Sequence, residues 1–344
     1  MKKNPHILAI RLSSMGDVAM TATVLRIFVA QNPTVKITFL SKGFLKPLFD
    51  DIPNVNFYIA ETDKKHKGIF GIFKLYKELK KLDFDAIADL HNVVRSKLLR
   101  TFFFRLKTAS IDKGRAEKKV LTSFPKQDFK PLKTSHERYA DVFRKLGFSI
   151  DLSKPVFPIA KELSKEIITI SGEKLQTEKW IGIAPFAQYE TKMYPLDLME
   201  KVISELSTKT NFKLFLFGGG KKEIAILSAL ENNYKNVISV AGKIKLAEEL
   251  ILISNLNCML AMDSGNAHFA AMMGVNTITL WGNTHPFAGF TPFNQPKENS
   301  ILSDLEQFPK IPTSVYGNKK VEGYEDVMKT ISPIKVIEKI INIA

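Results

Sequence analysis

The sequence predicts an α/β protein made of two tandem Rossmann-like domains, each a parallel sheet with helices on both faces. Short apolar runs alternate with helical patterns along nearly the whole chain, which is typical of strands joined by crossover helices. The length of 344 residues suits two domains. A stretch at 151–158 that contains Pro155 and Pro158 interrupts the alternation, and we interpret it as the linker. The predicted domains are therefore 1–155 and 156–344.

The first half opens with a buried strand over 7–12, then a small polar turn and a helix over 18–31 that stops before Pro33. A helix is also expected over 134–146, because Gly147 follows it as a suitable C-terminal cap. The other elements are expected in alternation, as strands over 35–40, 56–60 and 86–90 and helices over 69–82 and 94–104. The stretch 112–133 is basic, has two prolines and breaks the alternation, so we expect a loop there.

The alternation restarts in the second half, with a glycine-rich turn at 218–220 after its second strand. The expected strands are 180–184, 212–217, 237–240, 257–262 and 277–281. The expected helices are 196–206, 222–230, 246–253, 267–273 and 335–343. For the last of these helices, packing back on the first domain is an open alternative.

Composition excludes several classes of protein. Hydrophobic residues make up 45% of the chain, which argues against wholesale disorder. A single cysteine, Cys258, excludes an internal disulfide and multi-cysteine metal sites, and we expect it in the core. No apolar run approaches the ~20 residues of a transmembrane helix. The apolar stretch 7–10 ends at Arg11, too early for a signal peptide. We therefore expect a cytoplasmic protein.

The net charge of +15 lies entirely in the first half. Residues 1–160 hold 30 Lys and Arg against 15 Asp and Glu, whereas residues 161–344 hold 20 of each. Such asymmetry indicates a polyanionic partner for the first half: nucleic acid, an anionic membrane face or a phosphorylated substrate. A basic surface that is merely solvated is the alternative.

Ligands of doubly wound sheets bind beyond the carboxyl ends of the strands, so two such domains predict a site in the cleft between them. The turn after the first strand carries Ser13, Ser14 and Gly16 and ends in Asp17, at a helix start. A carboxylate there can accept a proton from a hydroxyl group. The structural alternative is an ordinary first-turn Asp with a serine cap.

The segment Met262–His268 joins a strand to a helix in the second half. The backbone N–H groups of a helix start bind anions, and the glycine permits close approach of a ligand. The alternative is a capped helix with a packed histidine. The candidate ligands in this turn are Asp263, Ser264, Gly265, Asn266 and His268.

Two further strand-end turns carry polar candidates. Glu223 follows the triple glycine at 218–220, where it can accept hydrogen bonds from ribose hydroxyls; a flexible turn with a solvated carboxylate is the alternative. Lys192, after the first strand of the second half, is a possible phosphate contact or simply a surface lysine. Thr284 and His285 follow the strand at 277–281 and are expected to line the same cleft.

In the basic half, His91 and Arg95 stand at the end of the strand at 86–90 and are candidates to grip an anionic acceptor, together with Arg115. The bland interpretation is that the basic residues only solvate a helix. The histidines show no paired spacing typical of a metal site, so we expect no metal and no cofactor.

Two of these segments together resemble a known family. Arg11–Asp17, followed by an apolar helix, resembles the opening of the ADP-heptose:lipopolysaccharide heptosyltransferases (glycosyltransferase family 9). Met262–His268, with Gly274 and Leu280–Pro286, resembles the second signature of that family, and 136–139 is a weaker match. The resemblance covers nearly the whole chain.

The resemblance implies the GT-B architecture of two Rossmann-like domains facing a cleft, with no required metal. It implies that the second half binds the nucleotide sugar and the first half the acceptor. Asp17 matches the family's general base, Lys192 its phosphate-contacting lysine and Glu223 its ribose-contacting carboxylate. The segment at 263–268 matches its sugar- and phosphate-binding loop.

The implied reaction is an inverting, metal-independent transfer of heptose from ADP-heptose to a lipopolysaccharide inner-core acceptor. In it, Asp17 takes the acceptor proton while Lys192 and the helix start near Asn266 stabilise the departing diphosphate. An anionic lipid acceptor also accounts for the basic first half, and implies a peripheral position on the inner membrane without nucleic acid as a partner.

The lysine region departs from the family pattern. It lacks adjacent threonines, and Glu190 adds negative charge close to a phosphate site, so the donor sugar stays open between heptose and another sugar. Two alternatives to the transferase remain: a non-catalytic polyanion-binding protein, and a nucleotide-sugar epimerase of the same architecture.

Overall fold

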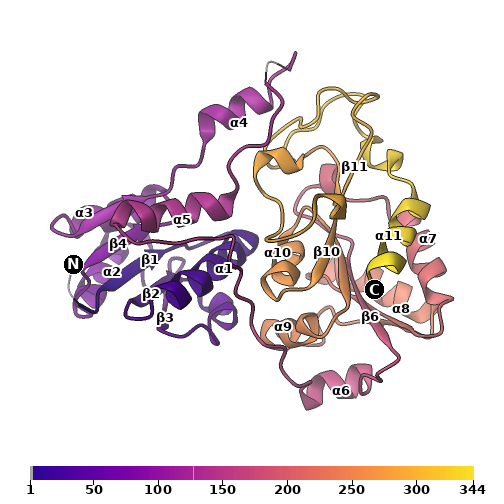
Figure 1. Ribbon diagram of the computed structural model, residues 1–344, viewed down its shortest axis with the longest axis horizontal. Coiled ribbons are helices and arrows are strands. Elements are labelled where there is room, and N and C mark those ends of the chain that lie inside the picture. Colours follow the sequence, from indigo (N-terminus) through magenta and orange to yellow (C-terminus); the bar gives the residue numbers. More distant parts are fainter. Residues whose placement is uncertain (1–2, 127) are drawn as a thin grey trace. The chain divides into compact units, whose positions relative to one another are not determined.

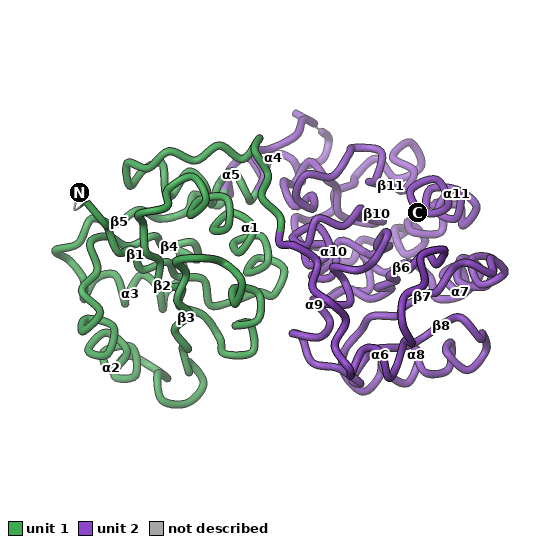
Figure 2. The backbone as a smooth tube through the Cα atoms, turned by 60° about the horizontal axis from the view of Figure 1, so that its bottom comes forward, with its two compact units in different colours: residues 1–113, 135–157 green, residues 114–134, 158–344 purple. Residues whose placement is uncertain are grey.

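The computed structural model describes residues 3–126 and 128–344, which form two compact α/β units (Figures 1 and 2). Unit 1 comprises Met1–Lys113 and Ser135–Phe157, and unit 2 comprises Gly114–Thr134 and Pro158–Ala344. The chain therefore passes between the units three times along its length. No helix among the residues described is long and apolar enough to cross a membrane.

Unit 1 contains a five-stranded parallel sheet in the order β3-β2-β1-β4-β5. Its strands are β1 (His6–Ile10), β2 (Lys36–Ser41), β3 (Val55–Ile59), β4 (Ala86–Asp89) and β5 (Lys107–Ser110). Its helices are α1 (Met15–Gln31), α2 (Gly68–Lys80), α3 (Val94–Phe102) and α5 (Ser135–Leu146), with a 3-10 turn at Gly43–Leu48.

The helices of unit 1 cover both faces of the sheet. Helices α1 and α5 pack together, and their contact includes the stacked rings of Phe28 and Phe143, with centroids 4.3 Å apart. Helices α2 and α3 pack together over the other face, where Leu8 and Ile10 of β1 meet Leu75 of α2 in one buried cluster. The central strands β1, β2 and β4 are buried along nearly their whole length because both faces are covered.

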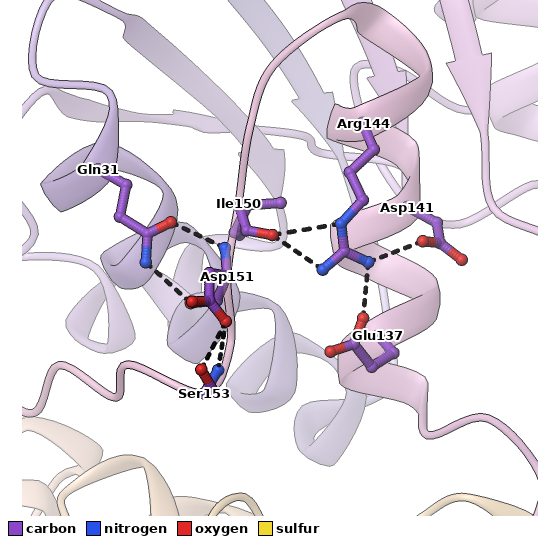
Figure 3. A network of polar contacts seen from close by, with 7 residues as sticks. All are labelled: Gln31, Glu137, Asp141, Arg144, Ile150, Asp151 and Ser153. Carbon is purple, nitrogen blue, oxygen red and sulfur yellow. Dashed lines mark hydrogen bonds and ion pairs between the residues drawn. The ribbon is translucent and has the colours of Figure 1, made fainter.

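A polar network anchors the end of unit 1 (Figure 3). The Arg144 guanidinium donates to the carbonyl oxygen of Ile150 through Nε (3.2 Å) and Nη2 (2.9 Å), and to the carboxylates of Glu137 (2.6 Å) and Asp141 (2.8 Å). The side-chain amide of Gln31 donates to the backbone carbonyl of Asp151 and accepts from its backbone N–H, each at 2.8 Å. The network ties the segment that leaves unit 1 to α5 and α1.

Unit 2 contains a six-stranded parallel sheet in the order β11-β10-β9-β6-β7-β8. Its strands are β6 (Lys179–Ala184), β7 (Phe212–Leu216), β8 (Val237–Ser239), β9 (Cys258–Met262), β10 (Asn276–Trp281) and β11 (Ser300–Leu302). Its helices are α4 (Arg115–Leu121), α6 (Lys165–Ser171), α7 (Leu196–Ser207), α8 (Lys221–Asn233), α9 (Leu246–Ser254), α10 (Gly265–Met272) and α11 (Pro333–Ile343).

The sheet of unit 2 is also covered on both faces. Helices α7, α8 and α11 bury their apolar sides in one cluster, which also holds Cys258. Helix α10 packs on β9 and β10 and against α9. The last helix, α11, lies on α7, β9 and β10, all in unit 2.

The expected loop over 112–133 is wrong in one respect, because it contains the short helix α4. The Gly114 residue before it takes a left-handed conformation, with φ of 60°, and Leu121 is buried. Lys118 is also buried, with its Nζ 4.2 Å from the centroid of the Phe290 ring. Because a lysine takes a buried position on α4, the sequence of this helix lacks the apolar pattern of a packed helix. Further along, the backbone N–H of Leu132 donates to the carbonyl oxygen of Phe287 (2.9 Å).

All strands in each sheet are parallel, but the order in which the chain adds them to the sheet changes direction at one place. In unit 1 the reversal lies between β1 and β4, and in unit 2 it lies between β6 and β9. The loops that leave these two neighbouring strands run to opposite sides of the sheet and leave a crevice beyond the carboxyl ends. The candidate residues Asp17 and His91 follow β1 and β4, and Lys192 and Asp263 follow β6 and β9.

Gly71 in α2 tests the packing of this helix against the loop that precedes it. A Cβ atom at Gly71 would lie 2.3 Å from the backbone carbonyl carbon of His66, which cannot move without shifting the loop. Gly71→Ala is therefore expected to lower the free energy of unfolding by about 2 kcal/mol, despite a gain in helix propensity of about 1 kcal/mol. Urea denaturation of the full chain measures the change. Gly219→Ala is the matched control, because no atom lies within 4 Å of a Cβ there. Equal stability of the two variants would contradict the prediction.

Candidate active site

Asp17 is the most densely contacted polar group at the carboxyl edge of the unit 1 sheet. Its Oδ2 atom lies 2.5 Å from Nη2 of Arg11 and accepts hydrogen bonds from the hydroxyl (2.8 Å) and the backbone N–H (3.5 Å) of Ser14. Its Oδ1 atom accepts from the hydroxyl of Tyr139 on α5, at 3.0 Å. The side chain is 24% exposed, so it is held by the protein and still open to a ligand.

These contacts determine the charge of Asp17. Burial by itself would raise the pKa of its carboxyl group, but the Arg11 guanidinium and the hydroxyls of Ser14 and Tyr139 outweigh burial and lower the pKa below its ordinary value. The same environment raises the pKa of the Tyr139 hydroxyl well above its ordinary value, mainly because it is buried, so Tyr139 stays a donor. Asp17 is therefore an ionised carboxylate at neutral pH.

Arg11 and Tyr139 contact Asp17 and are candidate site residues that our sequence reasoning did not assign. Arg11 also donates from Nη1 to the carbonyl oxygen of Leu90 (2.8 Å), and its guanidinium lies 5.6 Å from the centre of the Tyr139 ring. Both residues lie in segments noted for their resemblance to the family, which is the signal that was available. Tyr139 is 122 residues away from Asp17 in the sequence, so no local pattern could predict their contact.

His91 lies on the neighbouring strand end, next to this cluster. Its Nδ1 atom accepts from the backbone N–H of Leu12 (3.4 Å), and its own backbone N–H donates to Oδ1 of the buried Asp89 (3.0 Å). Burial, assisted by the charges of Arg11 and Lys113, lowers the pKa of His91 to about 4. The ring is neutral at pH 7, and since Nδ1 accepts, the hydrogen is on Nε2, where it can serve a ligand.

The other predicted acceptor residues divide between the units. Ser13 is exposed in the turn after β1, Gly16 lies in the first turn of α1, and Arg95 is exposed in the first turn of α3. Arg115 begins α4, which belongs to unit 2, and its side chain is exposed there. The structure of unit 1 therefore groups all the predicted acceptor residues except Arg115 at one sheet edge.

In unit 2, three predicted donor-binding residues come into direct contact. Lys192 donates from Nζ to the backbone carbonyl of Asp263 (2.5 Å) and lies 3.2 Å from its Oδ2 atom. The hydroxyl of Thr284 donates to the same Oδ2 atom, at 2.9 Å. The three residues follow β6, β9 and β10, which are neighbours in the sheet. The result is a fixed cation beside the start of α10.

The start of α10 carries the remaining residues of the 263–268 turn. Ser264 is its N-cap residue, and Gly265 and Asn266 form the first turn, so the N–H groups of this turn have no partner within the helix. The Oγ atom of Ser264 is buried without a hydrogen-bond partner among the residues described. His268 lies one turn further along α10 and is buried. Such a terminus with Lys192 nearby is suited to a phosphate group.

Glu223 and Glu190 have specific partners. Glu223, in the first turn of α8, accepts from the backbone N–H of Gly219 at 2.7 Å, which folds the glycine turn over the carboxylate. Glu190 forms an exposed ion pair with Lys320 at 2.7 Å. The negative charge expected near the phosphate site at Glu190 is thus paired with a lysine.

His285 and the metal question complete the list of candidates. The His285 ring is buried between Phe129 and Phe287, and burial, with the charge of Lys126 as a smaller cause, lowers its pKa to about 4. The ring is therefore neutral and packed on two aromatic side chains, and its Nε2 atom is buried without a hydrogen-bond partner among the residues described.

Within residues 3–126 and 128–344, no group of three or more His, Cys, Asp or Glu side chains is arranged to hold a metal ion.

Comparisons with known proteins show which proteins the chain resembles. The chain is 25% identical to lipopolysaccharide heptosyltransferase 1 of Campylobacter coli, over 95% of this chain and 98% of the relative. It is 27% identical to lipooligosaccharide heptosyltransferase 2 of Haemophilus influenzae, over 97% and 98% of the two chains.

Solved structures share the fold. The glycosyl transferase family 9 protein of Veillonella parvula superposes with a TM-score of 0.76 at 19% identity, covering 100% of this chain and 98% of that one. The Escherichia coli heptosyltransferase WaaC with ADP superposes with a TM-score of 0.71 at 18% identity, over 98% and 100% of the two chains. The fold is therefore the predicted GT-B architecture. The model of glycosyltransferase family 9 matches residues 72–319, more than half of the chain. The protein therefore belongs to glycosyltransferase family 9 (heptosyltransferase).

Proposed function

We propose that this glycosyltransferase moves heptose from ADP-heptose to a lipopolysaccharide inner-core acceptor, with inversion at the anomeric carbon and without a metal ion. The observation that carries the proposal is the ionised carboxylate of Asp17, held by Arg11, Ser14 and Tyr139 at the reversal point of the unit 1 sheet. The printed names of the relatives, lipopolysaccharide and lipooligosaccharide heptosyltransferases, support the sugar and the acceptor.

Unit 2 holds the donor in this proposal. The N–H groups at the start of α10 and the unpartnered Ser264 hydroxyl bind the diphosphate, and Lys192 supplies positive charge beside it. Glu223 accepts hydrogen bonds from the ribose. Fixed positive groups of the protein then stabilise the charge of the leaving diphosphate, which is the task that a divalent metal performs in other enzymes.

Unit 1 binds the acceptor and supplies the base. An acceptor hydroxyl donates to Oδ1 of Asp17, which carries one hydrogen bond from Tyr139 and has a second lone pair available. The acceptor oxygen bonds to the anomeric carbon as the bond from that carbon to the diphosphate oxygen breaks. The hydroxyl proton passes to Asp17, and ADP departs. A base of low pKa suffices because the hydroxyl becomes strongly acidic as its oxygen bonds to an oxocarbenium-like carbon.

Arg11 and His91 act on the acceptor side of the reaction. Arg11 keeps the Asp17 carboxylate ionised before the reaction and is placed to stabilise it throughout. The Nε2–H of His91 is a neutral donor for an acceptor oxygen, and the exposed Arg95 provides positive charge for its anionic groups. We propose that the protein works in the cytoplasm as a peripheral protein of the inner membrane, where an anionic lipid-linked acceptor resides.

The two alternatives account for less of the site. A non-catalytic polyanion-binding protein has no use for an ionised carboxylate held by three donors beside the acceptor groups. The UDP-N-acetylglucosamine 2-epimerase of Listeria monocytogenes shares the fold, with a TM-score of 0.50 at 12% identity, and that likeness concerns the fold alone.

Replacing the proposed base tests the reaction. Asp17→Asn removes the proton acceptor but keeps the shape of the side chain, so we expect transfer to fall by about 10²–10⁴-fold with unchanged affinity for ADP. Asp63→Asn is the matched control, since Asp63 is an exposed carboxylate of unit 1 paired with Lys42. The test compares the rates of transfer from ADP-heptose to a Kdo-lipid A acceptor for the original protein and both variants, with EDTA present. Full activity of Asp17→Asn would rule out Asp17 as the base.

The pH dependence of transfer follows from the lowered pKa of Asp17. The base form exists above this pKa and is lost as the pH falls through it, so the acid limb of kcat/KM lies below the ordinary carboxyl value of about 3.9. Tyr139→Phe removes one hydrogen bond to the carboxylate and is expected to move the acid limb to higher pH. The comparison of the two pH profiles measures the shift. An unchanged limb in Tyr139→Phe would show that another group governs it.

Calorimetric binding of ADP, UDP and GDP with EDTA present tests the donor site. We expect a preference for ADP and a loss of affinity of about 10-fold or more in Lys192→Ala, because one charge-assisted contact to phosphate contributes about 1.5–3 kcal/mol. Lys320→Ala is the matched control, since Lys320 is exposed and paired with Glu190. Preference for UDP or GDP would keep the fold and overturn the ADP-heptose assignment.

A further inference from the structure

Large apolar side chains are exposed along one edge of unit 1. Phe70 is 87% exposed and Val94 is 81% exposed, although each lies in the first turn of a helix that is otherwise packed on the sheet. Large exposed apolar side chains that lie together on one edge mark an interaction surface, whereas single exposed ones are ordinary. We call the set the apolar rim; it consists of Phe44, Ile59, Ile69, Phe70 and Val94.

The topology places the rim on one edge. Phe44 follows β2, Ile59 ends β3, Ile69 and Phe70 follow the loop after β3, and Val94 follows β4. Because all strands are parallel, every one of these positions lies beyond a carboxyl end. The strands concerned are neighbours through β1, so the rim extends over about 15 Å of sheet edge.

The two helices that carry most of the rim form one rigid body. The Phe73 and Phe102 rings meet edge to face with centroids 5.3 Å apart, and Tyr76 packs on Phe103 at 4.8 Å. Helices α2 and α3 lie side by side in both views of unit 1 (Figures 1 and 2). The rim is therefore a preformed surface.

Positive charge lies beside the rim. Lysines at 64, 65 and 67 precede α2, and Arg95 and Lys97 lie in the first turn of α3, all at the carboxyl edge of the sheet. Two exposed carboxylates, Glu61 and Asp63, lie in the same loop before α2, and Asp63 is paired with Lys42 at 3.2 Å. Lys64, Lys67 and Arg95 are exposed next to the rim itself.

We propose that the apolar rim inserts into an anionic lipid bilayer, with the surrounding lysines and arginines in contact with the lipid headgroups. Apolar side chains flanked by cations on a rigid surface are the composition of a protein that lies on a membrane. Each cation close to an anionic leaflet strengthens its attachment. A second copy of this chain is disfavoured as the occupant, because two such surfaces would bring like charges together.

The rim also has a place in the reaction, and this step rests on the proposed function. Asp17 and His91 lie beyond the carboxyl ends of β1 and β4, on the same edge as the rim. A protein docked by the rim presents its base toward the headgroup region. An acceptor hydroxyl a few sugar units above a lipid anchor lies in that region, so docking positions the acceptor before the donor reacts.

Vesicle flotation of the full chain tests the surface, without donor or acceptor in the assay. The vesicles consist of phosphatidylcholine, either alone or with about one third phosphatidylglycerol. The double variant Ile69→Ser/Phe70→Ser removes two rim side chains, and Phe104→Ser is the matched control. Phe104 is 77% exposed and lies in unit 1, but it follows the carboxyl end of α3, at the opposite edge of the sheet.

The proposal expects binding to the anionic vesicles, weaker binding to phosphatidylcholine alone, and weakening by salt as the charges are screened. The double variant should lose affinity by about 10-fold for each apolar side chain that no longer enters the bilayer, whereas Phe104→Ser should bind as the original protein does. Urea denaturation of each variant checks that unit 1, which carries these positions, is still folded.

Vesicle binding that survives in the double variant, or that falls equally in Phe104→Ser, would overturn the proposal. A change from dimer to monomer in the double variant without vesicles would assign the rim to a protein contact instead. The proposed function fails by a different result: active Asp17→Asn or preference for another nucleotide leaves vesicle binding unaffected. The two proposals are therefore separable.

Discussion

The direction of the strands is the constraint on which the rest of this molecule depends. Every strand of both sheets is parallel, so all the carboxyl ends of a sheet lie on one edge, and the strand order reverses once in each. Asp17 and His91 stand at the reversal in unit 1, and Lys192 and Asp263 stand at the reversal in unit 2. Because helices cover both faces, this edge is where polar side chains can gather without breaking a core. The apolar rim lies on the same edge of the unit 1 sheet.

Most of the fold could be predicted because buried parallel strands are continuous apolar runs and crossover helices are amphipathic. The elements that sequence reasoning missed lack these signals. Strand β5 reads Lys-Thr-Ala-Ser and is an edge strand with two exposed residues, and β11 has three residues. Helix α4 has seven residues and buries a lysine stem on Phe290, so its inner face does not look apolar. The register and order of the strands depend on contacts far apart in sequence.

The sequence named the positions of the candidate site but not the contacts that the structure shows among them. Positions in the turns that follow strands, together with the resemblance to the family, named Asp17, Lys192 and the 263–268 turn, and the structure joins Lys192 and Thr284 to Asp263. The partners of Asp17 were not assigned, since Tyr139 comes from α5 through packing of that helix on α1. Arg115 lies in the segment 114–134, which packs with unit 2. A local sequence pattern does not show with which unit a segment packs. Glu190 looked unfavourable because its partner, Lys320, is remote in the chain.

The position of the segment 114–134 in the chain affects the order in which the two units can fold during synthesis. It belongs to unit 2, although residues of unit 1 flank it on both sides. Lys118, Phe129 and Leu132 leave the ribosome long before Phe290, His285 and Phe287, on which they pack. Unit 1 has all its residues once Phe157 has been synthesised, whereas the partners of this segment at 285–290 are synthesised more than 120 residues later. Its cationic composition, with Arg115, Lys118, Lys119, Lys126, Lys130 and Lys133, suits a stretch that has to remain soluble and uncollapsed until its partner surface exists.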